Sequence, residues 1–366
     1  MLLVAKIGTS SVTSDSGAID DSSIESLCMQ VSSLVSNGHS VVIVTSGAVA
    51  AGLAALGKSR SEMSDLESLQ ALSAVGQSRL MRVYDQALGK FGLIGGQVLL
   101  APLDFVNRNQ YLHARQTLEK LLDLGVIPVI NENDAIADDE LRFGDNDRLA
   151  ALVAHLLNAD LLLILTDIAG LFTGDPKSSE NATLIEEVTE VNSELEKLAG
   201  GAGSDRGSGG MASKLAAAKI ATWSGVKAVI AAAERPNVLQ DAIDGVSGVG
   251  TYFPAKSRRL GARKLWIAFA LTSSGTIEID SGASVAIVER SSSLLPAGVT
   301  RVTGNFQDGD AVEILGQDKK LVAKGISSLT SSEIKRWMGY RTPDLPDGMS
   351  HEVIHRDDMV ILAGFD

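Results

Sequence analysis

Four polar residues, Asp145, Asn146, Asp147 and Arg148, stand directly ahead of an apolar helical segment in "FGDNDRLAALVAHL". Helix capping would explain one of them, because an Asp or Asn side chain accepts hydrogen bonds from the free N–H groups of a first turn. Four in succession exceed what a cap requires. We therefore interpret Asp145 to Asp147 as part of a binding site, with simple capping as the alternative.

Two lysines stand where the local pattern does not favour a cation. Lys6 interrupts the apolar run "LLVAKI", where an unpaired ammonium group would be costly to bury; the alternative is an edge residue that reaches water. Lys214 falls in the first turn of a helix that starts in "GSGGMASK", where the helix dipole disfavours a cation unless an anion is held there. The alternative for Lys214 is a solvated side chain. The glycine-rich stretch before it is either a phosphate-binding loop or a flexible surface loop.

The elements that must position these residues alternate along the first two thirds of the chain. Apolar runs predict strands at 2–7, 41–45, 95–100, 126–130, 161–165 and 226–231, and helical periodicity predicts helices at 20–36, 66–89, 108–124, 148–158 and 211–224. Continuous apolar strands are typical of a parallel sheet covered on both faces. We therefore expect an α/β fold, a three-layer α/β/α sandwich with a mainly parallel sheet. Ligands of such sheets bind beyond the carboxyl ends of the strands, where "KIGTSS", "TSGAVAAG", "NEND" and "TD" lie.

The pattern changes in the last quarter of the chain. Short β-like pieces such as "GTIEID", "ASVAIV" and "DAVEIL", separated by turn residues, predict a small, mostly β domain. We expect a larger α/β domain over 1–257, a linker over 258–271 and the β domain over 272–366.

Composition limits the class of protein. A net charge of −13 argues against binding nucleic acid or anionic membranes through bulk charge. The single cysteine, Cys28, lies in an apolar helical stripe and is expected to be buried, which fits a reducing compartment. The N-terminus is not typical of a signal peptide, and no apolar run reaches the length of a membrane span, so we expect a cytoplasmic protein. The five histidines have no metal-binding spacing, and no protein metal site is expected.

The motifs resemble, in order, those of the glutamate 5-kinases, a branch of the amino acid kinase family that carries a C-terminal PUA domain. The resemblance rests on "VAKIGTSSVT", "VTSGAVAAG", "FGDNDRLAALVA", "LLLILTDIAGLFTGDP", "GSGGMASKLAAAKIA" and the region after "ARKLW". It implies an amino acid kinase domain followed by a PUA-like domain. It also implies transfer of the γ-phosphoryl group of ATP to the side-chain carboxylate of L-glutamate, which gives γ-glutamyl 5-phosphate for proline biosynthesis. Mg²⁺ would be held largely by phosphates and water.

The resemblance implies roles residue by residue. Lys6 and Lys214 match the lysines that flank the transferred phosphoryl group, and Asp147 matches the aspartate that orients them. The positions that match the glutamate site are Ser46, Asp134 and Asn146. The positions that match the nucleotide site are Lys6, Thr166, Asp167, Ser208, Gly209, Gly210, Met211, Ala212, Ser213 and Lys214. Ser208 and Ser213 stand where relatives more often have Thr, and "AVIAAAERPNVL" has alanines where many relatives have a Gly near the nucleotide.

The resemblance also implies partners for this protein, and two alternative functions stay open. L-proline as a feedback inhibitor and a homo-oligomeric state are common in relatives. One rival function is that of another family member, acting on aspartate, acetylglutamate, carbamate or uridylate. A second is an RNA-binding module, because PUA domains elsewhere bind structured RNA. Residues 271–366 carry 9 Lys and Arg against 14 Asp and Glu, a poor match to a phosphate backbone, so RNA binding is not expected.

Overall fold

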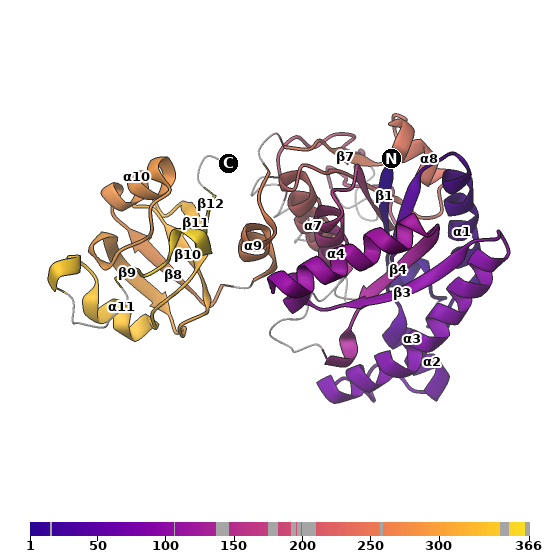
Figure 1. Ribbon diagram of the computed structural model, residues 1–366, viewed down its shortest axis with the longest axis horizontal. Helices are drawn as coiled ribbons and strands as arrows, with labels where there is room; N and C mark the ends of the chain where they lie inside the picture. Colours follow the sequence, from indigo (N-terminus) through magenta and orange to yellow (C-terminus); the bar gives the residue numbers. More distant parts are fainter. Residues whose placement is uncertain are drawn as a thin grey trace. The chain divides into compact units, whose positions relative to one another are not determined.

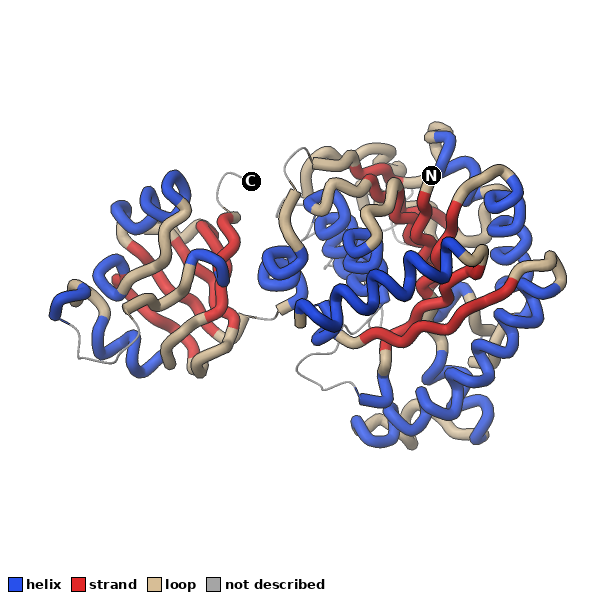
Figure 2. Tube along the Cα trace, in the orientation of Figure 1, coloured by secondary structure: helices blue, strands red, loops and turns tan. Residues whose placement is uncertain are grey.

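The computed structural model describes residues 1–14, 17–105, 107–136, 146–174, 182–191, 195, 199, 210–256, 259–271, 273–344 and 351–362. The chain divides into two compact units, Met1–Arg259 and Leu260–Asp366, and each is described by itself (Figures 1 and 2). The division falls inside the expected linker, 258–271, whose exact bounds stay a prediction.

The first unit is built on a seven-stranded sheet with the order β3-β4-β2-β1-β5-β6-β7. The strands are β1 (Leu2–Ile7), β2 (Ser40–Val44), β3 (Ile94–Leu100), β4 (Val126–Glu132), β5 (Leu161–Thr166), β6 (Lys227–Ala232) and β7 (Thr251–Phe253). All neighbours are parallel except β6 and β7, which are antiparallel. The expected mainly parallel sheet is thus confirmed. Only the short edge strand β7 was not predicted, because three residues are too few to show a periodicity.

Helices cover both faces of this sheet (Figure 1). They are α1 (Asp21–Ser36), α2 (Ala48–Leu56), α3 (Leu66–Gly89), α4 (Arg108–Asp123), α5 (Asn146–Leu156), α7 (Met211–Trp223) and α8 (Val238–Asp244). Helix α1 packs with α3 and α8, whereas α5 and α7 pack together and α4 lies against β4. The three-layer sandwich is therefore confirmed.

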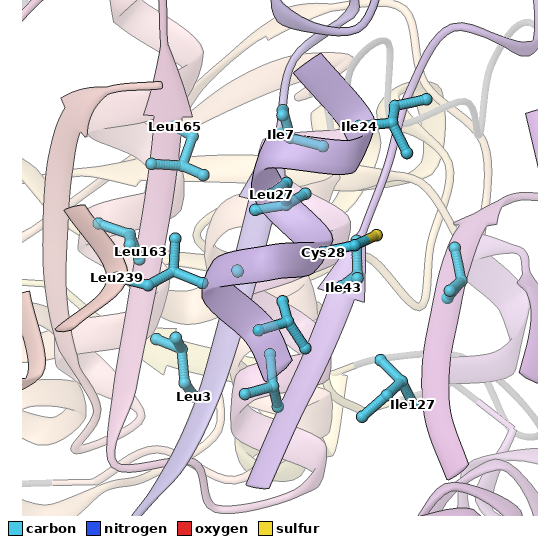
Figure 3. Close-up of a cluster of buried hydrophobic side chains, with 14 of the residues drawn as sticks. Leu3, Ile7, Ile24, Leu27, Cys28, Ile43, Ile127, Leu163, Leu165 and Leu239 are labelled. Atoms are coloured by element: carbon cyan, nitrogen blue, oxygen red, sulfur yellow. The ribbon is translucent and has the colours of Figure 1, made fainter. Parts of the chain in front are cut away.

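The two faces of β1 differ in what they contact. Leu3, Ala5 and Ile7 point into the apolar core beneath α1, where Figure 3 shows Leu27 and Cys28 close to the strands. Because successive side chains of a strand point to opposite faces, Lys6 faces the side of α5 and α7. Cys28 is fully buried as expected, and burial raises the pKa of its thiol to about 12, with a smaller contribution from Glu25.

Helix α2 was not predicted from the sequence, and its contact with α3 depends on two glycines. A Cβ at Gly76 would lie 1.8 Å from the carbonyl oxygen of Ala48, and a Cβ at Gly52 would lie 2.1 Å from that of Leu72. Only glycine allows the two backbones to approach so closely. Helix α2 starts directly after Gly47, whose φ of +106° makes the turn that follows Ser46. The α2–α3 contact therefore holds the loop at the end of β2.

The second unit contains a five-stranded sheet with the order β12-β11-β10-β8-β9. The strands are β8 (Gly275–Ile279), β9 (Val299–Gly304), β10 (Ala311–Leu315), β11 (Leu321–Ile326) and β12 (Met359–Ile361). Short helices accompany them: α9 (Ala262–Leu265), a π-helical turn (Trp266–Ala270), α10 (Ser281–Arg290) and α11 (Ser331–Trp337). Its core includes Ile277, Phe306 and Ile314.

The prediction that "ASVAIV" is a β-like piece is wrong, because these residues lie within α10. Asp280 caps this helix by accepting a hydrogen bond from the N–H of Ala283. Only Ile287 of α10 is buried, so its β-branched residues reflect a partly exposed helix rather than a strand. In both units, none of the helices that the structure describes combines the length and the apolar character of a membrane span.

Candidate active site

Two lysines far apart in the sequence meet on one carboxylate. Lys6 Nζ lies 2.5 Å from Asp147 Oδ1, and Lys214 Nζ lies 3.1 Å from Asp147 Oδ2. Ser213 Oγ also donates to Oδ2, at 2.8 Å. The exposed fractions of Lys6, Asp147 and Lys214 are 2%, 0% and 5%, so two cations and one anion share a nearly dry site. Two ammonium groups gathered on one carboxylate suit an anionic ligand.

The environment of Asp147 keeps it ionised. Burial alone would raise the pKa of its carboxyl group, but the charges of Lys6 and Lys214, with hydrogen bonds from Lys6 and Ser213, hold the pKa below its ordinary value of 3.8. A carboxylate that stays charged in the absence of ligand can hold both ammonium groups in place.

Three elements position this group at the carboxyl edge of the sheet. Lys6 is next to last in β1, a central strand whose register places it between Val44 of β2 and Ile164 of β5. Asp147 belongs to the first turn of α5, and Lys214 to the first turn of α7, which packs against α5. The alternative interpretations, that Lys6 is an edge residue and that Lys214 is solvated, are therefore wrong.

Asn146 joins the loop that follows β2 to the end of β4. Its Nδ2 group donates to the carbonyl oxygen of Thr45 at 2.5 Å, to Ser46 Oγ at 3.0 Å and to Asn131 Oδ1 at 2.6 Å. The structure thus brings Asn146 and Ser46, both predicted to bind the substrate, into direct contact. Asn146 is also the residue directly before Asp147 in the sequence. Simple capping of α5 does not describe Asn146, because its amide bonds to the loop after β2 and to β4.

Asp134, the third residue of the predicted substrate site, follows β4 in a short 3-10 turn, Asp134–Ile136. Its Oδ2 atom accepts a hydrogen bond from Ser73 Oγ of α3, at 3.2 Å. Among the described residues, no hydrogen bond joins Asp134 to Asn146, and their shared role stays a prediction.

The predicted nucleotide site is described in part. Thr166 ends β5 and donates through Oγ1 to Asp167 Oδ1, at 3.0 Å; Thr166 is buried and Asp167 exposed. Gly210 is the N-cap of α7 and supplies no side-chain oxygen to its first turn, formed by Met211, Ala212, Ser213 and Lys214. An uncapped helix start favours an anion. Ser208, Gly209 and Asp145 lie outside the described residues.

Three polar residues that contact this site were given no role from the sequence: Ser73 and Gln77 of α3, and Asn131 of β4. Gln77 Oε1 accepts a hydrogen bond from Asn131 Nδ2, at 2.8 Å. The signal was present, because Ser73 and Gln77 lie one helical turn apart on a face otherwise lined by Leu69, Leu72 and Leu80. A polar pair within an apolar stripe indicates a buried polar contact.

Comparisons with known proteins follow the division of the chain. Residues 1–232 match the amino acid kinase family, and residues 275–346 match the PUA domain. The glutamate 5-kinase of Trichlorobacter lovleyi is 43% identical over 99% of this chain and 96% of its own length. That of Nocardia farcinica is 44% identical over 98% of this chain and 96% of its own length. The chain belongs to the glutamate 5-kinase branch of the amino acid kinase family.

Solved structures support the fold of this glutamate 5-kinase family member. An isopentenyl phosphate kinase aligns with a TM-score of 0.50 at 18% identity, covering 69% of this chain and 100% of that protein. The UMP kinase of Bacillus anthracis aligns with a TM-score of 0.50 at 17% identity, covering 70% of this chain and 96% of that protein. At such low identity the likeness concerns the fold alone. The expected amino acid kinase fold and PUA domain are both confirmed.

Proposed function

We propose that this protein transfers the γ-phosphoryl group of ATP to the side-chain carboxylate of L-glutamate, forming γ-glutamyl 5-phosphate, the first step of proline biosynthesis. The full-length similarity to glutamate 5-kinases supports this assignment. The observation that carries it is the contact of Lys6 and Lys214 with Asp147, directly beside Asn146 and Ser46. The proposed phosphate site and the proposed amino-acid site would therefore adjoin.

The reaction needs alignment and charge neutralisation more than covalent help from the protein. A side-chain carboxylate oxygen of glutamate forms a bond to the γ-phosphorus, and the bond from that phosphorus to the oxygen bridging to the β-phosphate breaks, releasing ADP. No general base is required, because the attacking carboxylate is already ionised near neutral pH. The ammonium groups of Lys6 and Lys214 would stabilise the negative charge on the transferred group, with Asp147 holding both in position.

The nucleotide would bind through Thr166 and Asp167 at the end of β5 and through residues 208–214, of which Met211 to Lys214 form the first turn of α7. The uncapped first turn of α7 supports this placement. Mg²⁺ would enter as the complex with ATP. The described residues hold no cluster of three or more His, Cys, Asp or Glu side chains, and both carboxylate oxygens of Asp147 are engaged by lysines or serine. The ion would thus be held by phosphates and water.

Family resemblance supports three further proposals. L-proline, which carries the same α-carboxylate as glutamate, would inhibit by occupying the glutamate pocket or its surroundings. Second, the protein would act as a homo-oligomer in the cytoplasm. Third, its kinase domain would span 1–257, with a linker at 258–271 and the PUA-like domain at 272–366. The glutamate requirement measured with and without L-proline, and the mass in solution by light scattering, test the first two.

Trapping the acyl phosphate tests the main proposal. The purified chain is incubated with ATP, Mg²⁺ and hydroxylamine, and with glutamate, aspartate, N-acetylglutamate or glutarate; ADP release is followed with carbamate and UMP. We expect hydroxamate with glutamate and little with the other acids. Stronger activity on another acceptor, or none on glutamate, would overturn the assignment.

A further inference from the structure

Helix α3 presents three polar side chains to the loops of the proposed glutamate pocket. Ser73 donates to Asp134, Gln77 accepts from Asn131, and the Tyr84 hydroxyl lies 2.8 Å from Thr45 Oγ1. Ser73, Gln77 and Tyr84 are all buried. Their spacing of four and seven residues places them on one face of the helix. This face of α3 therefore contacts both the end of β2 and the segment that follows β4.

The orientation of the amides in this network is determined by two backbone groups. Asn131 Oδ1 accepts from the N–H of Glu132 at 3.0 Å, so Asn131 must direct its NH₂ group at Gln77, which in turn must present its Oε1. At the other end, Asn146 faces the carbonyl oxygen of Thr45 and must direct its NH₂ group inward. In the row formed by Gln77, Asn131 and Asn146, only one orientation of the three amides therefore satisfies all of these hydrogen bonds.

This orientation of the amides determines which hydrogen-bonding atoms Asn146 and Gln77, at the two ends of the row, can still offer. The Nδ2 group of Asn146 has two hydrogens and three acceptors within reach, so Oδ1 is the atom it can offer to a ligand. An oxygen acceptor suits the α-ammonium group of an amino acid. At the opposite end, Gln77 Nε2 is buried and has no hydrogen-bond partner in the described part of the chain. A buried donor left unpaired is costly, and an arriving acceptor would relieve that cost.

We propose that Gln77 is a positioning residue of the glutamate site: its Oε1 holds the Asn131 side chain in place, Asn131 Oδ1 in turn holds the Asn146 amide, and Asn146 Oδ1 is thereby placed to accept from the substrate α-ammonium group. This inference rests on the proposed function. The Gln77 side chain is 8% exposed, and its contact is to Asn131 rather than to the lysines or Asp147. Loss of Gln77 should therefore weaken glutamate binding while leaving the ATP requirement unchanged.

Two substitutions separate positioning from a merely structural role. Gln77→Met keeps the approximate volume and removes both hydrogen-bonding atoms; we expect the KM for glutamate to rise about tenfold, the value of one lost hydrogen bond, with the KM for ATP within about twofold. Gln77→Glu should mimic glutamine when its carboxyl group is protonated, because it then offers one acceptor and one donor. When ionised, it places a negative charge next to an anionic substrate.

The KM for glutamate of Gln77→Glu should therefore be well above that of the wild type at about pH 8.5 and fall towards it at about pH 6, since burial raises the pKa of a carboxyl group. The titratable groups of the elements packed here, Glu132, Asp134, Tyr84 and Asp147, are common to both proteins, so the difference reports on residue 77. Gln86→Glu, the same change on the exposed face of α3, should leave the KM unchanged at both pH values.

Hydroxamate formation by the wild type is measured in the same series. An inactive wild type would overturn the proposed function itself. An active wild type with unchanged glutamate KM in Gln77→Met would overturn the positioning role alone, even if its melting temperature falls. If Gln77→Glu does not fold, Gln77→Met and thermal unfolding still decide the matter, because a structural role lowers Tm without changing the ratio of the two KM values.

Discussion

Lys6 Nζ lies 2.5 Å from Asp147 Oδ1, and the two side chains are 3% and 0% exposed. A pair so deeply buried is not evidence of stability by itself, because removing two charges from water costs about as much as their attraction returns. A second lysine contacts the same carboxylate. Two ammonium groups gathered at one point are better explained by an anionic ligand than by the fold.

The first prediction concerns Lys214. We expect Lys214→Ala to lower kcat by roughly 10²- to 10³-fold, the usual cost of losing one group that stabilises charge in the transition state. Folding should be retained, because Asp147 keeps its contacts with Lys6 and Ser213. Steady-state kinetics and thermal unfolding measure the two effects. Lys227→Ala, on an exposed lysine of β6, serves as the control, and a Lys214 variant with most of its turnover would contradict the assignment.

The second prediction concerns stability against pH. The pKa of Asp147 is lowered in the folded protein relative to its ordinary value of 3.8, so the unfolded chain binds the proton more readily. The stability that this carboxylate contributes is therefore present above about pH 5 and lost as the pH falls through 3.8 and below. In Asp147→Asn, the stability that the wild type loses when this carboxylate is protonated at low pH should not be lost. At pH 7 the variant should be less stable than the wild type by about 3–5 kcal/mol, since two buried ammonium groups lose their counter-ion.

Urea unfolding at a series of pH values checks this prediction. Asp85→Asn removes the same charge from an exposed position of α3 and should reproduce the wild-type profile. Equal slopes for the wild type and Asp147→Asn between pH 5 and pH 3 would show that the Asp147 carboxylate is not held ionised as described.

The third prediction concerns the amino-acid pocket. Asn146→Ala and Asp134→Ala should each raise the KM for glutamate roughly 10- to 100-fold, as expected for hydrogen bonds to charged groups, with a smaller change in the KM for ATP. Initial rates at varied concentrations of each substrate separate the two effects. Asn109→Ala, on an exposed residue of α4, is the matched control. Unchanged glutamate saturation in both variants would remove these residues from the pocket.

The fourth prediction concerns the α2–α3 contact. Gly76→Ala introduces a methyl group 1.8 Å from a backbone oxygen of α2, which cannot give way as a side chain could. We expect a loss of about 1–3 kcal/mol in unfolding free energy and a raised KM for glutamate, because α2 follows the loop that holds Ser46. Gly89→Ala, in the same helix with open space around it, should be neutral or stabilising by up to about 1 kcal/mol. Similar destabilisation by both changes would contradict the packing argument.

Strong periodicity made much of the fold predictable. The expected helix 66–89 coincides with α3, and each of the six expected strands is present. Helix α2 was missed because its alanines and glycines carry no contrast between faces, and α10 was mistaken for a strand because its β-branched residues suggest extended backbone. The local conformational propensities of the residues in α2 and α10 were misleading, because contacts with the rest of the protein decide the conformation there.

The site was predictable only where a residue was out of place in its own element. Lys6 in an apolar strand and Asp147 among four polar residues could be recognised in this way. Gln77 was missed, because a glutamine is acceptable in any helix; its place with Ser73 in an apolar stripe indicates a buried polar contact, but only the tertiary structure identifies Asn131 as the partner.

The alternation of strands and helices, and the gathering of polar residues at strand ends, can be predicted from the amino-acid sequence, because periodicity records which side of each element is buried. The position of β1 between β2 and β5, and the packing of α5 against α7, become known from the folded chain. These neighbours depend on contacts between segments far apart in the chain, which leave no local pattern. The meeting of Lys6, Asp147 and Lys214 is a consequence of that order.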